Sequence, residues 1–176
     1  SHVLYSLIKI ASRGEKDGYH FDPDTTIGII FGEKSVPYRS GRVCVIEELF
    51  TGTGIHFRST EHIQEEIWSK FLLNVCNNLP QAILGAGVGC YNDSVHMKVI
   101  SRELGKELKA VAAAKGIDMS KADASSNIGS MVPSSARYST LQDLDAGRHT
   151  EIEMFSGVLV RMGKELGIPM PYNEYT

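Results

Sequence analysis

The chain has 176 residues, 42% of them hydrophobic, and a formal net charge of −3 at pH 7. This length fits one large domain or part of a two-domain protein, and the hydrophobic fraction is enough to fill a core. The slightly acidic balance gives no electrostatic case for nucleic-acid binding. No apolar run reaches the roughly 18 residues of a membrane-spanning helix, and the N-terminus does not resemble a secretory signal peptide.

The cysteines and histidines do not form a recognisable ligand pattern. Cys44, Cys76 and Cys90 are odd in number and lack C-x-x-C spacing, which favours reduced thiols in a cytoplasmic protein over a disulfide framework or a zinc site. The six histidines show no H-x-x-x-H spacing. We therefore expect no metal site.

The first sixty residues read as strands with one helix. Residues 1–60 are too few for a complete α/β domain, so we interpret them as the end of one. β-branched and large apolar residues, turn residues and glycines predict the following elements in order: a strand from Val3 to Ala11, a charged turn from Gly14 to Gly18, a short strand to Phe21, a turn at Asp22-Pro23-Asp24, a strand from Thr25 to Gly32, a helix from Arg42 to Phe50, and a strand from Ile55 to Arg58.

The chain from residue 61 onward reads as helical. Ser59 or Thr60 can cap the first helix, and Pro80 should kink it or end its regular part. Thr150 can cap the last helix, and Gly167 and Pro169 should stop it. The predicted helices span Glu61 to Leu84, Asp93 to Lys115, Ser134 to Ala146, and Thr150 to Leu166, with a loop from Gly116 to Pro133 and with Ile152, Phe155, Leu159, Met162 and Leu166 on the inner face of the last helix.

A row of polar residues marks the first of these helices. Lys70, Asn74 and Asn78 stand four residues apart, slightly more than one helical turn, so their side chains project from one face. One interpretation is a lysine that reaches solvent and two amides that satisfy nearby backbone groups. The other is a row that lines a cleft, with the lysine as an acid and the amides as substrate ligands.

Three further features have ordinary explanations. The glycines of Gly85-Ala-Gly-Val-Gly89 resemble part of a dinucleotide-binding loop, but they follow a helix and lack the third spacing, so we expect a helix stop and tight turn. Ser139 lacks the G-x-S-x-G context of a hydrolase nucleophile. Glu151, directly after the predicted Thr150 cap, is well placed for the helix dipole without any other role.

Two motifs together nevertheless resemble a known family. Trp68-x-Lys70-x3-Asn74-x3-Asn78, followed some sixty residues later by Ser139-Thr-Leu-Gln-Asp-x4-Gly-Arg-x-Thr150-Glu151-Ile, is similar to ketopantoate reductases (2-dehydropantoate 2-reductases), as is the tail from Gly167 to Asn173. The resemblance covers essentially the whole chain. It implies a mainly α protein with an α/β remnant: residues 1–60 would be the last strands of a Rossmann-like nucleotide-binding domain, and residues 61–176 a helical substrate-binding domain of the 6-phosphogluconate dehydrogenase C-terminal type.

The resemblance also implies an activity and the residues that carry it. The reaction would be the NADPH-dependent reduction of 2-dehydropantoate to pantoate in pantothenate biosynthesis. Lys70 would be the general acid that protonates the ketone oxygen, while Asn74, Asn78, Ser139 and Glu151 would bind the substrate. Lys70 and Glu151 would also contact the cofactor. The known chemistry agrees with the second interpretation of the polar row, because an ammonium can stabilise the charge that develops on the oxygen.

The sequence departs from the family pattern at its ends. The G-x-G-x-x-G loop and the asparagine that the family contributes from its first domain are absent, and the chain stops at Thr176, where the family continues into a last helix. We therefore expect a fragment that is inactive alone. Two alternatives stay open: a reductase of this architecture for another 2-keto acid, and a non-catalytic helical module for homodimerisation.

Overall fold

A computed structural model describes residues 3–10, 12–24, 26–34, 39–122 and 132–176. Its contacts divide the chain into two compact units, the first within residues 1–67 and 120–127 and the second within residues 68–119 and 128–176. None of the helices among the described residues is both long enough and apolar enough to cross a membrane.

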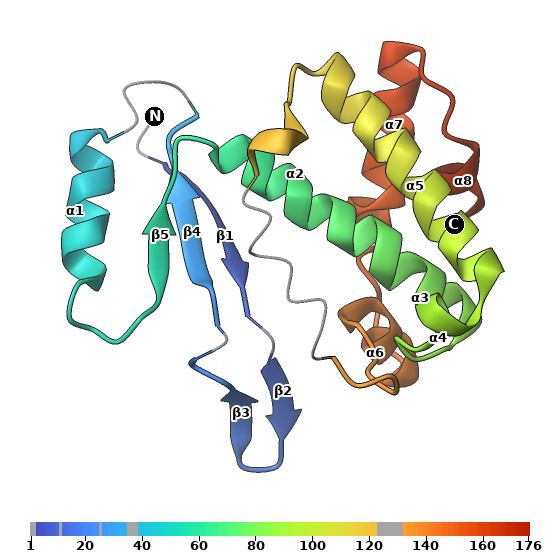
Figure 1. The fold of residues 1–176 in the computed structure, drawn as a ribbon, viewed down its shortest axis with the longest axis horizontal. Coiled ribbons are helices and arrows are strands. Elements are labelled where there is room, and N and C mark those ends of the chain that lie inside the picture. Colours follow the sequence, from blue (N-terminus) through green and yellow to red (C-terminus); the bar gives the residue numbers. More distant parts are fainter. Residues whose placement is uncertain (1–2, 11, 25, 35–38, 123–131) are drawn as a thin grey trace. The chain divides into compact units, whose positions relative to one another are not determined.

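The first unit contains a three-stranded mixed sheet and a separate hairpin (Figure 1). In the sheet, β1 (Tyr5–Lys9) pairs antiparallel with β4 (Gly28–Gly32), and β4 pairs parallel with β5 (Phe57–Ser59). The hairpin joins β2 (Ser12–Glu15) to β3 (Gly18–Phe21). The expected strands are present with shifted ends, but β2 was not predicted, because Gly14 and Glu15 of the expected turn lie in this strand and the turn itself is only Lys16 and Asp17. Ala11 and Thr25 lie outside the described residues.

Helix α1 (Gly41–Phe50) makes the crossover between the parallel strands β4 and β5. The Ser40 hydroxyl accepts a hydrogen bond from the Val43 amide and caps its N-terminus. Val43 is buried together with Ile30 and Phe31 of the central strand. A strand, a helix and a parallel strand form one βαβ unit, the building block of nucleotide-binding α/β domains.

A buried carboxylate ties the strands of this unit to the start of the next helix. Glu66 lies in α2 (Ile63–Leu73) and is 1% exposed. One of its oxygens lies 3.0 Å from the Lys9 ammonium of β1, and the other lies 2.8 Å from the Arg58 guanidinium of β5. The hydroxyl of Thr60 accepts from the His62 amide in the turn before the helix. Because α2 begins only at Ile63, the predicted cap at Ser59 or Thr60 is wrong.

The second unit is helical (Figure 1). Its elements are the end of α2, the π-helical turn η1 (Asn74–Asn78), α3 (Leu79–Leu84), α4 (Cys90–Asp93), α5 (Val95–Ala114), α6 (Ser139–Asp145), the 3₁₀ turn η4 (Ile152–Met154), α7 (Ser156–Leu166) and α8 (Pro171–Tyr175). Of the 3₁₀ turn η2 (Met119–Lys121), only Met119 belongs to this unit. The core consists of buried apolar residues from η1, α3, α5 and α7 and from the positions directly before α7 and α8: Val75, Leu79, Leu104, Leu108, Val111, Phe155, Leu159 and Met170.

The fold class predicted from the sequence is confirmed, but several helix ends differ. Ser94 is extended and its hydroxyl caps α5, so the helix predicted from Asp93 begins at Val95, and Asp93 is the last residue of the separate helix α4. The predicted loop from Gly116 contains the turn η2, and its residues 123–131 lie outside the described residues. Leu166, expected on the inner face of the last helix, is 39% exposed.

The Thr150 cap is wrong, because α7 begins only at Ser156. The Ser156 hydroxyl is buried and donates to the Asn173 side chain of α8. Asn173 in turn binds Glu107 of α5, whose carboxylate also accepts from the backbone amides of Tyr172 and Asn173. This buried network holds the first turn of α8 against α5, and tertiary contacts of this kind override a local capping signal.

Candidate functional site

The helix that carries the polar row changes its winding at the row itself. The segment from Asn74 to Asn78 is a π-turn, and Pro80 follows in the first turn of α3. A proline has no amide hydrogen and its ring clashes with the carbonyl four residues before it. Widening the preceding turn moves that carbonyl away, so the helical path continues to Leu84 and does not stop. Pro80 was predicted to disturb the helix, and the disturbance is this π-turn.

The π-turn affects how the three side chains line up. Four residues exceed one turn of an α-helix, but they fall short of one turn of a π-helix, whose hydrogen bonds span five residues. Around the helix axis, the Asn74 side chain is therefore offset from Lys70 in one direction, and Asn78 is offset from Asn74 in the opposite direction. Lys70 and Asn74 are half-buried, whereas Asn78 is 6% exposed. Exposure therefore decreases along the polar row, from the half-buried Lys70 to the buried Asn78.

The buried end of the row meets the second motif. The side-chain nitrogen of Asn78 donates a 3.2 Å hydrogen bond to the hydroxyl oxygen of Ser139, which is the first residue of α6. The Ser139 residue is itself exposed. Two candidate site residues from motifs 61 residues apart are therefore in direct contact.

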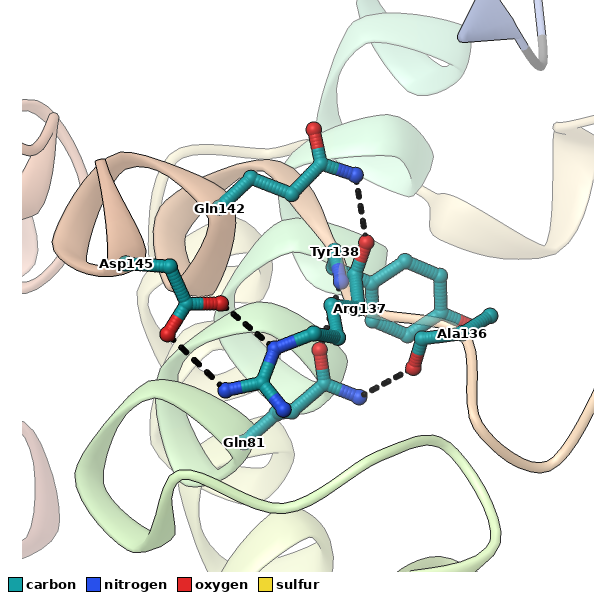
Figure 2. A network of polar contacts seen from close by, with 6 residues as sticks. All are labelled: Gln81, Ala136, Arg137, Tyr138, Gln142 and Asp145. Atoms are coloured by element: carbon teal, nitrogen blue, oxygen red, sulfur yellow. Dashed lines mark hydrogen bonds and ion pairs between the residues drawn. The ribbon is translucent and has the colours of Figure 1, made fainter.

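A buried glutamine that the sequence analysis did not single out supports this contact. Gln81 of α3 is fully buried, and its side-chain amide binds the backbone on both sides of Arg137 (Figure 2). Its position three residues after Asn78, within an otherwise apolar run, was the signal available in the sequence. The predicted helix from Ser134 is wrong in its first turn, because α6 begins at Ser139 and the preceding residues form this backbone contact.

The glycine-rich segment has the structural role predicted for it. Gly85 has φ of +62° and ends α3 in the left-handed conformation. The amides of Val88 and Gly89 donate to the carbonyls of Ala136 and Ser134 at 2.9 and 2.7 Å. Because these amides are already bonded to protein, the segment does not offer them to a phosphate, and it does not fit a pyrophosphate cradle.

Glu151 lies outside the helix for which its dipole role was considered. It is exposed, and its carbonyl accepts from the amides of Met154 and Phe155 at the start of η4. The first residue of α7 is Ser156. The sequence alone suggested that Glu151 stabilises the dipole of an α-helix from a position at its N-terminus. This interpretation is wrong, because the α-helix begins five residues later. Among the described residues, the structure contains no group of three or more His, Cys, Asp or Glu side chains that could hold a metal ion.

Comparison with known proteins decides the family. The family model for the C-terminal region of ketopantoate reductase (PanE/ApbA) matches residues 62–176, more than half of the chain. The chain belongs to the ketopantoate reductase family. The resemblance inferred from the two motifs is thereby confirmed.

Relatives named 2-dehydropantoate 2-reductase support the ketopantoate reductase assignment. One from Archaeoglobus fulgidus is 28% identical over 134 residues, which is 76% of this chain and 45% of the relative. Another, from Caulobacter vibrioides, is 32% identical over 128 residues, or 71% of this chain and 43% of the relative. The chain spans about half the length of the curated relatives it matches.

Solved ketopantoate reductase structures share the fold. The enzyme from Ralstonia eutropha JMP134 superposes with a TM-score of 0.79 at 23% identity, covering 98% of this chain and 56% of that one. A dimeric ketopantoate reductase from Staphylococcus aureus gives 0.80 at 19% identity, covering 98% and 58%. A D-mandelate dehydrogenase, solved with NADH and anilino(oxo)acetate, gives 0.67 at 19% identity, covering 84% and 62%.

Proposed function

We propose that this chain is the substrate-binding part of an NADPH-dependent 2-dehydropantoate 2-reductase. Residues 1–60 would be the end of its nucleotide-binding domain, and residues 61–176 its substrate-binding domain. The observation that carries the proposal is the hydrogen bond between Asn78 and Ser139, because it joins two separately recognised motifs at one place. The names of the curated relatives support the substrate.

The proposed roles follow from the chemistry of ketone reduction. Addition of a hydride to the carbonyl carbon places negative charge on the carbonyl oxygen, and Lys70 would donate a proton to that oxygen. The amides of Asn74 and Asn78 and the hydroxyl of Ser139 offer donors and acceptors for the substrate's carboxylate and hydroxyl. The Glu151 carboxylate would accept from the substrate hydroxyl.

The cofactor would be held mainly by residues other than those described. A reduced nicotinamide, when bound, supplies the hydride. Lys70 and Glu151 are the proposed cofactor contacts on this chain, and a carboxylate suits a hydroxyl or amide of that molecule but not its phosphates. Since the glycine segment does not fit a pyrophosphate, we expect the isolated chain to be inactive, and measurable turnover by the purified 176-residue chain would contradict this expectation.

The proposal is tested by titrating pantoate into the chain and into its Asn78→Ala variant, using isothermal calorimetry. We expect binding by the natural sequence and a weaker affinity in the variant. A chain that is folded but shows no heat of binding with pantoate or 2-dehydropantoate would overturn the proposal.

A second candidate is a reductase for a different 2-keto acid. The structural similarity to a D-mandelate dehydrogenase favours it, since that protein has the same fold and was solved with an oxo-acid ligand. Comparing kcat/KM for 2-dehydropantoate with that for a 2-keto acid of similar size lacking the hydroxyl discriminates the two, in a reductase that contains this chain. A preference for the second substrate would favour this candidate.

A third candidate is a helical module for homodimerisation without catalysis. The dimeric Staphylococcus aureus enzyme motivates it, because its fold includes the same helices. Sedimentation equilibrium combined with the pantoate titration separates the possibilities, since a dimer that does not bind pantoate would favour the module. A cytoplasmic location, expected from the three free cysteines, is likewise a proposal.

A further inference from the structure

We propose that Gln81 is a positioning residue that fixes the N-terminus of α6 and thereby holds Ser139 against Asn78. The consequence for ligand affinity rests on the proposed function. The consequence for the local structure does not, and it can be measured without any ligand.

The geometry of the Gln81 amide carries the inference (Figure 2). Its oxygen Oε1 accepts a hydrogen bond from the backbone amide of Tyr138 at 2.5 Å. Its nitrogen Nε2 donates to the carbonyl of Ala136 at 3.3 Å. Both ends of one side chain are therefore bonded to the backbone that leads directly into Ser139.

The bond to Tyr138 replaces a local cap that the sequence of α6 cannot provide. Tyr138 is the N-cap residue and makes no side-chain cap bond. In a capping box, the third helical residue reaches back with a Glu or Gln side chain to the N-cap amide. That position in α6 is Leu141, which is apolar and buried. Gln81 supplies the missing acceptor from α3.

Gln81 and Asn78 hold the same short segment at two points. They lie three residues apart in the sequence, so they project from neighbouring positions of one helical face. Gln81 binds on both sides of Arg137, and Asn78 binds the Ser139 hydroxyl. The amides of Val88 and Gly89 already bind the carbonyls of Ala136 and Ser134 upstream. Gln81 adds the contact at the Tyr138 amide, directly before Ser139, and so fixes the direction in which α6 begins.

The site requires a neutral group with one donor and one acceptor. Leu in place of Gln81 would leave the Tyr138 amide and the Ala136 carbonyl without this partner. An ionised Glu would accept from Tyr138, but its second oxygen would face the Ala136 carbonyl. A protonated Glu has a hydroxyl donor and a carbonyl acceptor, so it can reproduce both bonds. Burial raises the pKa of a carboxyl, so the protonated form should persist well above the ordinary range.

Variants of Gln81 provide a test in which one substitution should restore the natural contacts at low pH. Gln81→Glu and Gln81→Leu are compared with the control Gln142→Leu, which removes an exposed amide that donates to the Arg137 carbonyl on the same segment. Hydrogen exchange of the Tyr138 amide, which donates to the Gln81 side chain, and pantoate affinity are measured between pH 5 and 8, relative to the natural sequence at each pH. The groups near Gln81 should not titrate in this range, because burial raises the pKa of the Tyr91 and Tyr138 hydroxyls. Arg137 and Asp145 pair with each other at the surface.

We expect Gln81→Leu to lose exchange protection at the Tyr138 amide and to weaken pantoate binding about tenfold or more, because that amide loses its buried acceptor. Gln81→Glu should resemble the natural sequence at low pH and approach Gln81→Leu as the pH rises, while Gln142→Leu stays unchanged. If Gln81→Leu does not fold, the pH dependence of Gln81→Glu carries the test.

The inference is overturned if protection of the Tyr138 amide is unchanged in the Gln81 variants, or if Gln142→Leu loses it equally. It is also overturned if Gln81→Glu shows no recovery at low pH. Absence of pantoate binding by the natural sequence would overturn the proposed function alone, and the exchange data would still decide the role of Gln81.

Discussion

The side-chain nitrogen of Asn78 lies 3.2 Å from the hydroxyl oxygen of Ser139, across 61 residues of sequence. The contact places the π-turn at the end of the first helical segment against the beginning of α6. Each residue therefore limits where the other can point. A ligand that binds one of them meets the other.

The Asn78–Ser139 contact should appear as an energetic coupling. We predict that Asn78→Ala and Ser139→Ala each weaken pantoate binding, and that the double variant weakens it by less than the sum of the two effects, because the second substitution removes a partner already lost. The free energies come from calorimetric titrations. Ser135→Ala, at an exposed serine on the same segment, should have no effect. Strict additivity would contradict a shared site.

Lys70 should matter for the chemical step. In a reductase containing this chain, we predict that Lys70→Ala lowers kcat by roughly 10²- to 10⁴-fold, the usual contribution of a general acid. Steady-state kinetics over a range of pH measure this effect. Lys164→Ala, which changes an exposed lysine on α7, serves as the control. Near-normal kcat at every pH would identify Lys70 as a lysine that only reaches toward solvent.

Glu151 should affect binding and not stability. It is exposed, and α7 begins five residues later, so we predict that Glu151→Gln leaves the melting temperature nearly unchanged. Pantoate affinity should fall, because charge-assisted hydrogen bonds are about twice as strong as neutral ones. The matched control is Glu153→Gln, at an exposed carboxylate on the same 3₁₀ turn.

A comparison of substrates sharpens the Glu151 prediction. If Glu151 binds the hydroxyl, kcat/KM for 2-dehydropantoate should fall more than kcat/KM for a keto acid without that hydroxyl. An equal loss for both substrates would show that Glu151 does not recognise the hydroxyl.

The extent to which the sequence predicted this structure differs from residue to residue. Helical spacing placed Lys70, Asn74 and Asn78 on one face, and the resemblance joined them to Ser139. The sequence signalled an irregularity through Pro80 but could not distinguish a kink, a stop and a π-turn, because all three relieve the same clash. It could not predict that Gln81 binds the backbone near Tyr138, since that contact depends on how α3 and α6 pack. Thr150 carried a local capping signal that the buried network around Ser156 overrides.

Cys76 should be chemically protected. Burial raises the pKa of the Cys76 thiol to about 11. At pH 8 its thiolate fraction is about a hundredfold lower than that of a thiol with a pKa near 9. We predict that iodoacetamide modifies the exposed Cys44 well before Cys76, as measured by mass spectrometry of peptides. Equal rates of modification of Cys44 and Cys76 in the folded chain would show that burial does not protect Cys76.

The raised pKa of the Cys76 thiol should also make the free energy of unfolding depend on pH. Between about pH 9 and 11 the unfolded chain releases the Cys76 proton while the folded chain retains it, so the unfolded state binds fewer protons. The free energy of unfolding should therefore decrease as the pH rises through this window. Urea titrations at pH 8 and 10 measure the decrease, which should be smaller in Cys76→Ala.

Thr140 should tolerate the loss of its hydroxyl. The residue is 3% exposed, and its hydroxyl oxygen is buried without a hydrogen-bond partner among the described residues. Thr140→Val replaces the hydroxyl with a methyl group of similar shape and removes the cost of burying it. We predict an unchanged or higher melting temperature by calorimetry, and a decrease would contradict this account.

The π-turn between Asn74 and Asn78 also bears on how this chain is compared with its relatives. A π-turn uses more residues than the α-turn it replaces. A relative with a regular α-helix here would therefore cover the same distance along the helix axis with fewer residues. An alignment without a gap would then pair residues after Asn78 with neighbours that face another direction. Gln81 would be matched with the wrong position, and its counterpart in a relative should be sought by its contact with the segment before α6 and not by counting along the helix.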